Sequence, residues 1–95
     1  MKKSLSDKII EYFRKKPVLK AYIFGSIARN ESDENSDIDI MVELDYSHSI
    51  GLEFVEMQLD LEELLDRKVD LLSSNAISKY IKPFVDKDKI LIYEK

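Results

Sequence analysis

The stretch AYIFGSIARNESDENSDIDIMV, residues 21–42, decides how this chain folds. It begins as an apolar run that ends in Gly25-Ser26, and it closes with alternating polar and apolar residues from Ser36 onward. Because successive strand side chains point to opposite faces, the closing part predicts a strand with Asp37 and Asp39 on one face and with isoleucine and valine on the other. Two carboxylates this close repel each other, and a bound divalent cation would remove that penalty.

The two halves of the stretch suit two parts of one ligand. Hard oxygen donors suit Mg²⁺, which keeps several waters and is commonly shared with substrate phosphates. Glycine lets the backbone approach a ligand closely, and backbone N–H groups at a helix start favour phosphate. We therefore expect Gly25-Ser26 to lie where a strand turns into a short helix and to hold a phosphate tail, with the metal at Asp37 and Asp39.

Length and composition indicate one domain over residues 1–95. The net charge of −4 argues against a broad nucleic-acid surface, and the absence of cysteine excludes disulfides and thiolate metal sites. No apolar stretch approaches the ~20 residues that span a bilayer, and the start of the chain lacks the apolar core of a signal peptide. We expect a cytoplasmic protein without direct nucleic-acid or membrane partners.

Hydrophobic periodicity and turn residues predict alternating helices and strands. The last predicted helix would be capped by Asn75 and broken or kinked at Pro83. Interleaved elements of this kind predict an α/β sheet that is covered on at least one face. Helices are expected over 4–15, 26–30, 50–66 and 76–86, and strands over 18–24, 37–44, 69–72 and 90–93.

The predicted helix over 50–66 is apolar around more of its circumference than a surface helix requires. The surplus residues either face a partner protein or pack beneath a loop or a neighbouring helix, and the sequence leaves both open. The main stripe consists of Ile50, Phe54, Met57, Leu61, Leu64 and Leu65, and the surplus of Leu52, Val55 and Leu59.

Gly25-Ser26, followed after ten residues by Asp37-Ile38-Asp39, resembles the signature of the DNA polymerase β-like nucleotidyltransferase superfamily. The runs Phe24–Arg29 and Ser36–Ile40 look especially like the minimal nucleotidyltransferases, or MNT proteins, and so do Arg67–Leu71 and the closing Ile-Tyr-Glu. The resemblance implies a small mixed β-sheet flanked by helices, which is the α/β (α+β) fold of that superfamily.

The resemblance also assigns roles to individual residues. Asp37, Asp39 and Asp70 would be the catalytic acids and would bind one or two Mg²⁺ ions, with Asp70 as the third metal ligand or as the base. The nucleotide, expected to be ATP, would be bound by Gly25, Ser26, Arg29 and Ser36. For two of these residues the structural alternatives stay open, because Arg29 could form an ion pair with Glu31, Asp33 or Asp37 and Ser36 could be a hydrogen-bonding turn residue.

MNT proteins of this kind pair with a HEPN-type toxin, so the resemblance implies an antitoxin that transfers AMP from ATP to a toxin hydroxyl, expected to be that of a tyrosine. Two alternatives stay open: an antitoxin that neutralises its toxin by binding alone, and a nucleotidyltransferase that acts on a small molecule such as an antibiotic. A homodimer is also left open.

Overall fold

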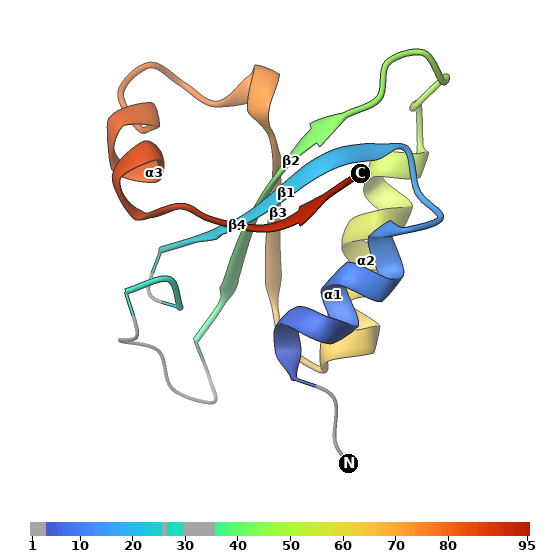
Figure 1. Cartoon of the computed structure of the whole chain (residues 1–95), viewed down its shortest axis with the longest axis horizontal. Helices are drawn as coiled ribbons and strands as arrows, with labels where there is room; N and C mark the ends of the chain where they lie inside the picture. The colour runs from blue at the N-terminus through green and yellow to red at the C-terminus, as the bar shows by residue number, and fades with distance from the viewer. Residues whose placement is uncertain (1–3, 26, 30–35) are drawn as a thin grey trace.

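Four strands form one mixed sheet in the computed structural model, which describes residues 4–25, 27–29 and 36–95. The strands are β1 (Val18–Phe24), β2 (Ile38–Leu44), β3 (Val69–Ser73) and β4 (Ile90–Glu94), in the spatial order β3-β2-β1-β4. Strand β1 runs antiparallel to both β2 and β4, whereas β2 and β3 are parallel (Figure 1). The predicted mixed sheet with flanking helices is confirmed.

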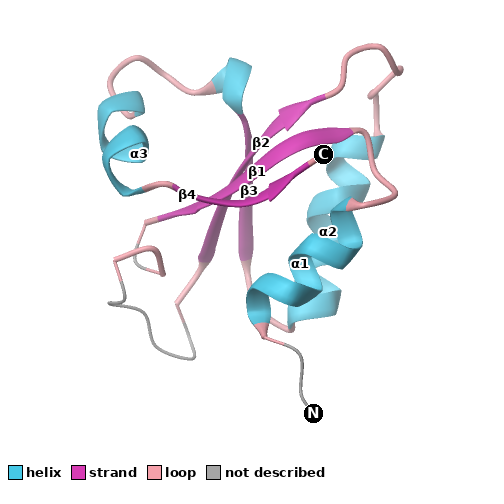
Figure 2. Cartoon of the chain, in the orientation of Figure 1, coloured by secondary structure: helices cyan, strands magenta, loops and turns pink. Residues whose placement is uncertain are grey.

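Helices lie on both sides of this sheet. Helix α1 (Leu5–Phe13) and helix α2 (Glu53–Leu65) pack side by side against one face (Figure 2). The opposite side carries the short 3₁₀ helix η1 (Ser74–Ala76) and helix α3 (Lys82–Asp88). Helix α3 lies over the sheet face to which Asp39 points, so α3 and the predicted metal site are on the same side of the sheet.

The main core lies between the sheet and the pair α1 and α2. Ile38, Ile40 and Val42 are fully buried there, as the alternating pattern of this stretch predicts. The other residues of β2 alternate with these three, so they face the opposite, less covered side of the sheet.

Ser4 caps the start of helix α1, and its hydroxyl accepts a hydrogen bond from the backbone N–H of Asp7.

The prediction of one helix over 76–86 is wrong. The chain forms η1, then an irregular segment, and α3 begins only at Lys82, with Pro83 in its first turn. Proline lacks a backbone N–H and clashes with the preceding turn, so it is tolerated at a helix start and not in a helix interior. The predicted cap at Asn75 is also wrong, since Ser73 caps η1.

The segment after β1 also differs from the prediction of a helix over 26–30. Residues 27–29 form a turn, in which the backbone N–H of Arg29 donates to the carbonyl of Gly25 at 3.1 Å. Ser26 and Asn30 lie outside the described residues. The turn follows directly on β1, so it begins at the same end of the sheet as Asp37 and Asp39.

Helix α2 buries Met57, Leu61 and Leu65 and leaves the predicted surplus residues on the surface. Leu52 is 78% exposed, and Val55 and Leu59 are more than half exposed. Nothing in the described part of the chain covers these three side chains, so packing beneath a loop does not explain them. Within the same residues, none of the helices has the length and apolar character needed to cross a membrane.

Candidate active site

Asp39 and Asp70 meet on the sheet face that α1 and α2 leave uncovered. The parallel register of β2 and β3 places the two residues directly opposite each other, so their carboxyl groups lie within electrostatic reach of each other. Burial and the neighbouring charge of Asp70 raise the pKa of Asp39 to about 6, with a smaller contribution from Asp37. Two carboxyl groups that repel each other in this way can hold a divalent cation, whose charge would remove the repulsion.

Gly25 directly follows β1 and lies against the side chain of Asp39. Its neighbour Phe24 is in register with Asp39, and Gly25 itself has a φ of +75°, which side chains with a Cβ rarely adopt. A Cβ atom built at Gly25 would overlap the Oδ2 atom of Asp39. The glycine is therefore required here both for its backbone conformation and for the close approach of the main chain to the acids. Ser26, predicted to share its role, lies outside the described residues.

Asp37 lies one residue before β2, with a part-exposed side chain. Its Oδ2 atom is 4.0 Å from Nζ of Lys68, and its side chain is 44% exposed. In the residues that the structure describes, no group of three or more acidic or histidine side chains is gathered closely enough to hold a metal ion. The geometry thus brings Asp39 and Asp70 together, and Asp37 would have to turn from Lys68 to complete a three-acid site.

The donor set fits Mg²⁺. Asp39 and Asp70 offer carboxylate oxygens, which this ion prefers, and their mutual repulsion is a cost that the ion would remove. Magnesium is commonly bound by one or two carboxylates together with waters and substrate phosphates, so this pair can serve as the protein part of such a site.

Arg29 links the segment after β1 to helix α3. Its Nη1 atom donates to Oδ2 of Asp88 at 2.6 Å. Its positive charge offsets a small part of the rise in the pKa of Asp39. An ion pair was one of the two predictions for Arg29, and the structure shows one with Asp88, 59 residues away. Glu31 and Asp33, two of the predicted partners, lie outside the described residues. The side chain is 46% exposed and lies within electrostatic reach of the acid pair, so its predicted contact with phosphate stays a prediction.

Arg67 was not singled out as a functional residue from the sequence. Its Nε and Nη2 atoms donate to the carbonyl oxygen of Ser36 at 3.2 and 2.6 Å. At the starts of β2 and β3, the backbone N–H of Ile38 also donates to the carbonyl of Lys68 at 3.0 Å. These contacts hold the start of β2 against the start of β3, and thereby set Asp39 opposite Asp70.

Ser36 takes part in this arrangement through its backbone. The carbonyl that receives both Arg67 contacts lies immediately before Asp37, and the side chain of Ser36 is half-buried. Hydrogen bonding at the turn before the strand is thus observed for the main chain. Contact of the Ser36 side chain with nucleotide stays a prediction.

Known proteins share this arrangement of sequence and fold. Residues 7–95 match the family described as Polymerase beta, Nucleotidyltransferase. The chain belongs to this family. As a polymerase β-family nucleotidyltransferase it has the fold and the enzyme class that Gly25-Ser26 and the Asp-x-Asp pair predicted.

Relatives narrow the position of this nucleotidyltransferase within the family. A protein of Methanocaldococcus jannaschii that is provisionally assigned as a protein adenylyltransferase is 47% identical over 78 residues, which cover 82% of this chain and 83% of that protein. The protein adenylyltransferase MntA of Thermococcus cleftensis is 34% identical over 70 residues, which cover 74% of this chain and 70% of that protein. The predicted resemblance to MNT proteins is confirmed.

A solved structure shows the same fold. A chain in a crystal structure of a toxin–antitoxin with AMP-PNP superimposes on this nucleotidyltransferase with a TM-score of 0.80 at 26% identity. The match covers 95% of this chain and 73% of that chain.

Proposed function

We propose that this nucleotidyltransferase is the antitoxin of a toxin–antitoxin pair and that it transfers AMP from ATP, with Mg²⁺, to a tyrosine hydroxyl of a HEPN-type toxin. The observation that carries the proposal is the pairing of Asp39 with Asp70 across β2 and β3, beside the glycine that follows β1. The protein adenylyltransferase relatives and the toxin–antitoxin structure with AMP-PNP support the acceptor class and the nucleotide.

The chemistry requires one bond to form as another breaks. The tyrosine oxygen bonds to the α-phosphorus of ATP while the bond from that phosphorus to the bridging oxygen breaks, which leaves an AMP ester on the toxin and releases pyrophosphate. The hydroxyl proton passes to Asp70 or to water. Bound Mg²⁺, held by Asp39 and Asp70 with Asp37 as the further predicted ligand, would neutralise charge on the phosphates and activate the attacking oxygen.

The main chain around the acids supplies the rest of the site. Gly25 has no Cβ, so phosphate oxygens can approach the backbone beside Asp39. Positioning and charge neutralisation account for most of the rate in phosphoryl chemistry, and both depend on the fixed register of β1, β2 and β3. The protein therefore contributes a rigid edge on which ATP is aligned.

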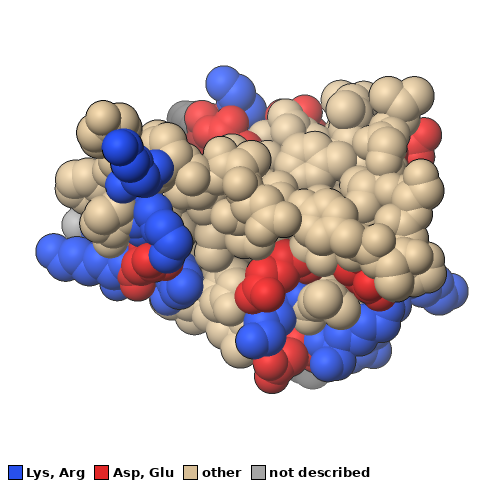
Figure 3. Space-filling view, turned by 90° about the horizontal axis from the view of Figure 1, so that it is seen from above, with Lys and Arg blue, Asp and Glu red and all other residues tan. Residues whose placement is uncertain are grey.

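The surface of the molecule is compatible with a protein partner. Figure 3 shows a broad area without charged side chains on the face seen from above, with basic and acidic side chains gathered toward its edges. Large apolar residues are exposed at the start of α2 and along it, at Leu52, Val55 and Leu59, and before and within α3, at Tyr80 and Phe84. Exposed apolar side chains that gather on one face are typical of surfaces that bind another protein.

The proposal is tested by incubating the purified protein with ATP labelled on the α-phosphate, Mg²⁺ and the toxin encoded beside it. Label on a toxin tyrosine, identified by peptide mass spectrometry, is the expected result. Asp39→Asn and Asp70→Asn should each abolish labelling, while Glu63→Gln, an exposed carboxylate on α2, should not.

Two results would contradict transfer to the toxin. Neutralisation of the toxin that survives Asp39→Asn and Asp70→Asn together would indicate an antitoxin that acts by binding alone. Label on an antibiotic, with none on a protein, would indicate a small-molecule nucleotidyltransferase.

A further inference from the structure

A second cleft lies on the same sheet face as the acid pair, farther along β2. Its floor is formed by Tyr22 and Met41, which are directly paired across β1 and β2. Asp39, Met41 and Glu43 point to one face because alternate strand residues do so, and Met41 lies about 7 Å along the strand from Asp39. The cleft is therefore one strand repeat from the proposed metal site.

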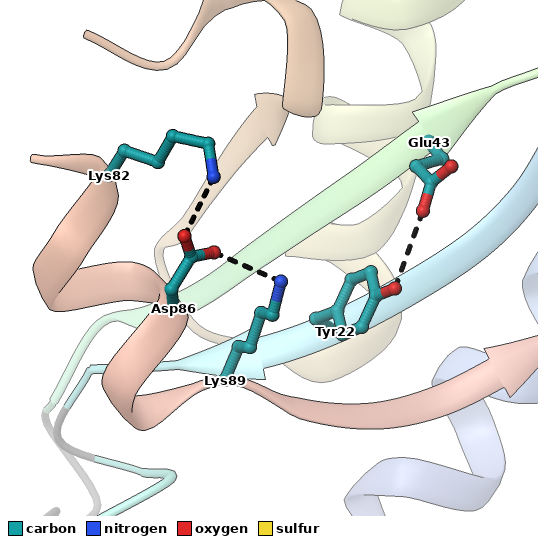
Figure 4. Close-up of polar contacts among 5 residues, drawn as sticks. All are labelled: Tyr22, Glu43, Lys82, Asp86 and Lys89. Atoms are coloured by element: carbon teal, nitrogen blue, oxygen red, sulfur yellow. Dashed lines mark hydrogen bonds and ion pairs between the residues drawn. The ribbon is translucent and has the colours of Figure 1, made fainter. Parts of the chain in front are cut away.

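The roof of this cleft comes from the segment between β3 and β4. Ile77 adds an apolar wall, and Lys82 and Lys89 reach across from either end of α3 (Figure 4). Asp86 lies between the two lysines and accepts from Lys82 at 2.7 Å and from Lys89 at 3.0 Å. The enclosed volume is about 100 Å³, which suits one ring system rather than a whole nucleotide.

The charges inside the cleft balance. Two lysines face two carboxylates, those of Asp86 and Glu43, so the cleft offers no net positive charge to a further phosphate. Its other surfaces are the ring of Tyr22, which lies 5.0 Å from Nζ of Lys89, the thioether of Met41 and an isoleucine. A flat ring and two apolar side chains among several polar groups suit an uncharged, planar ligand that also carries hydrogen-bonding groups.

The carboxylate of Glu43 can accept hydrogen bonds from a ligand. The hydroxyl of Tyr22 donates to its Oε2 atom at 3.3 Å, which is long for an O–H donor. An ionised carboxylate has about four acceptor positions, so Glu43 can accept further donors such as ribose hydroxyls or an exocyclic amine.

The position of Gly25 indicates in which direction a bound nucleotide would lie along β2. The phosphate tail is expected at this residue, which lies at the end of β1 beside Asp39, and the cleft lies on the other side of Asp39 along β2. We propose, on the basis of the proposed function, that the cleft between Tyr22, Met41 and α3 receives the nucleoside end of ATP, with Glu43 as a hydrogen-bond acceptor for it.

The test compares Mg²⁺-ATP with Mg²⁺-tripolyphosphate, which has the phosphates and no nucleoside, by isothermal titration calorimetry. Wild-type protein should bind ATP at least about tenfold more tightly than tripolyphosphate. Glu43→Gln should weaken ATP binding about tenfold and leave tripolyphosphate unchanged. Ser74→Trp, which places a large ring at the mouth of the cleft, should remove the preference for ATP altogether.

Glu63→Gln is the matched control for the carboxylate change, and a thermal melt of each variant checks that it folds. The proposal is overturned if the two cleft variants bind ATP like wild type, including the case in which they lose only transfer to the toxin, since that would make the cleft an acceptor site. Equal binding of ATP and tripolyphosphate by the wild type would overturn the cleft proposal and leave the proposed function standing. Binding of neither would overturn both.

Discussion

Asp39 of β2 and Asp70 of β3 lie directly opposite each other on neighbouring parallel strands, and the charge of Asp70 helps to raise the pKa of Asp39. The residues are far apart in the chain, and α2 makes the connection that allows their strands to run parallel. The pair is part-buried and lies beside Gly25, so a group that enters there meets two acids and exposed backbone at once.

Replacing Asp39 by asparagine should stabilise the metal-free protein at neutral pH. The pKa of Asp39 is about 6 in the folded chain against a reference value of 3.8, so its ionisation opposes folding as the pH rises from about 4 to about 6. The gain for Asp39→Asn at pH 7.5 in EDTA should be about 1 kcal/mol, a figure reduced because solvent screens a part-exposed carboxyl. Urea unfolding at pH 7.5 and pH 4 measures it.

The gain should vanish at pH 4, where the folded protein keeps Asp39 protonated and pays no penalty. Added Mg²⁺ should raise the melting temperature of the wild type and not that of Asp39→Asn. A variant that is less stable than wild type at pH 7.5 in EDTA would show that the acid pair is not strained.

Gly25→Ala and Gly51→Ala form a matched pair. Both glycines have positive φ, but an added Cβ at Gly51 meets nothing within 4 Å, whereas at Gly25 it overlaps Asp39. We expect a loss of about 1 kcal/mol for Gly51→Ala and about 3 kcal/mol for Gly25→Ala, by chemical unfolding. Equal losses would mean that Gly25 is needed only for its backbone angle.

Removing Arg67 should loosen the start of β2. Arg67→Met deletes both hydrogen bonds to the Ser36 carbonyl, which should cost about 1–2 kcal/mol of unfolding free energy and weaken Mg²⁺ binding. Arg67→Lys keeps the charge but lacks the planar fork that supplies two donors, so it should recover only part of the loss. Unchanged Mg²⁺ affinity in Arg67→Met, measured by calorimetry, would separate Arg67 from the site.

Two leucines of α2 should behave differently. Leu61 is fully buried between helix and sheet, and Leu61→Ala should cost about 2–5 kcal/mol. Leu59 is 59% exposed, and Leu59→Ala should change the unfolding free energy by about 0.5 kcal/mol or less. Denaturant melts of the two variants make the comparison, and a large loss in Leu59→Ala would show that this side chain is covered.

The strands and the face to which Asp39 points were largely predictable, because short periodic runs report directly on burial. Ile38, Ile40 and Val42 alternate in sequence and are buried, and the predicted bounds of β1 agree with the structure. The place of Asp70 in the site came only from the resemblance to the nucleotidyltransferase superfamily, since parallel pairing joins distant residues and leaves no local pattern.

Contacts between distant side chains could not be predicted in the same way. Arg29 pairs with Asp88, and Arg67 holds the Ser36 carbonyl, and in each case the partner becomes a neighbour only once the sheet is assembled. The helix expected over 76–86, with a break or kink at Pro83, is wrong because proline is tolerated in the first turn of a helix, and α3 begins there, at Lys82.

A crystal structure of the protein with Mg²⁺ and a non-hydrolysable ATP analogue tests the proposed site most directly. We expect a cation about 2.0–2.1 Å from carboxylate oxygens of Asp39 and Asp70, with phosphate oxygens against the backbone of Gly25. A nucleotide bound elsewhere, or a cation that contacts neither acid, would contradict the proposed site.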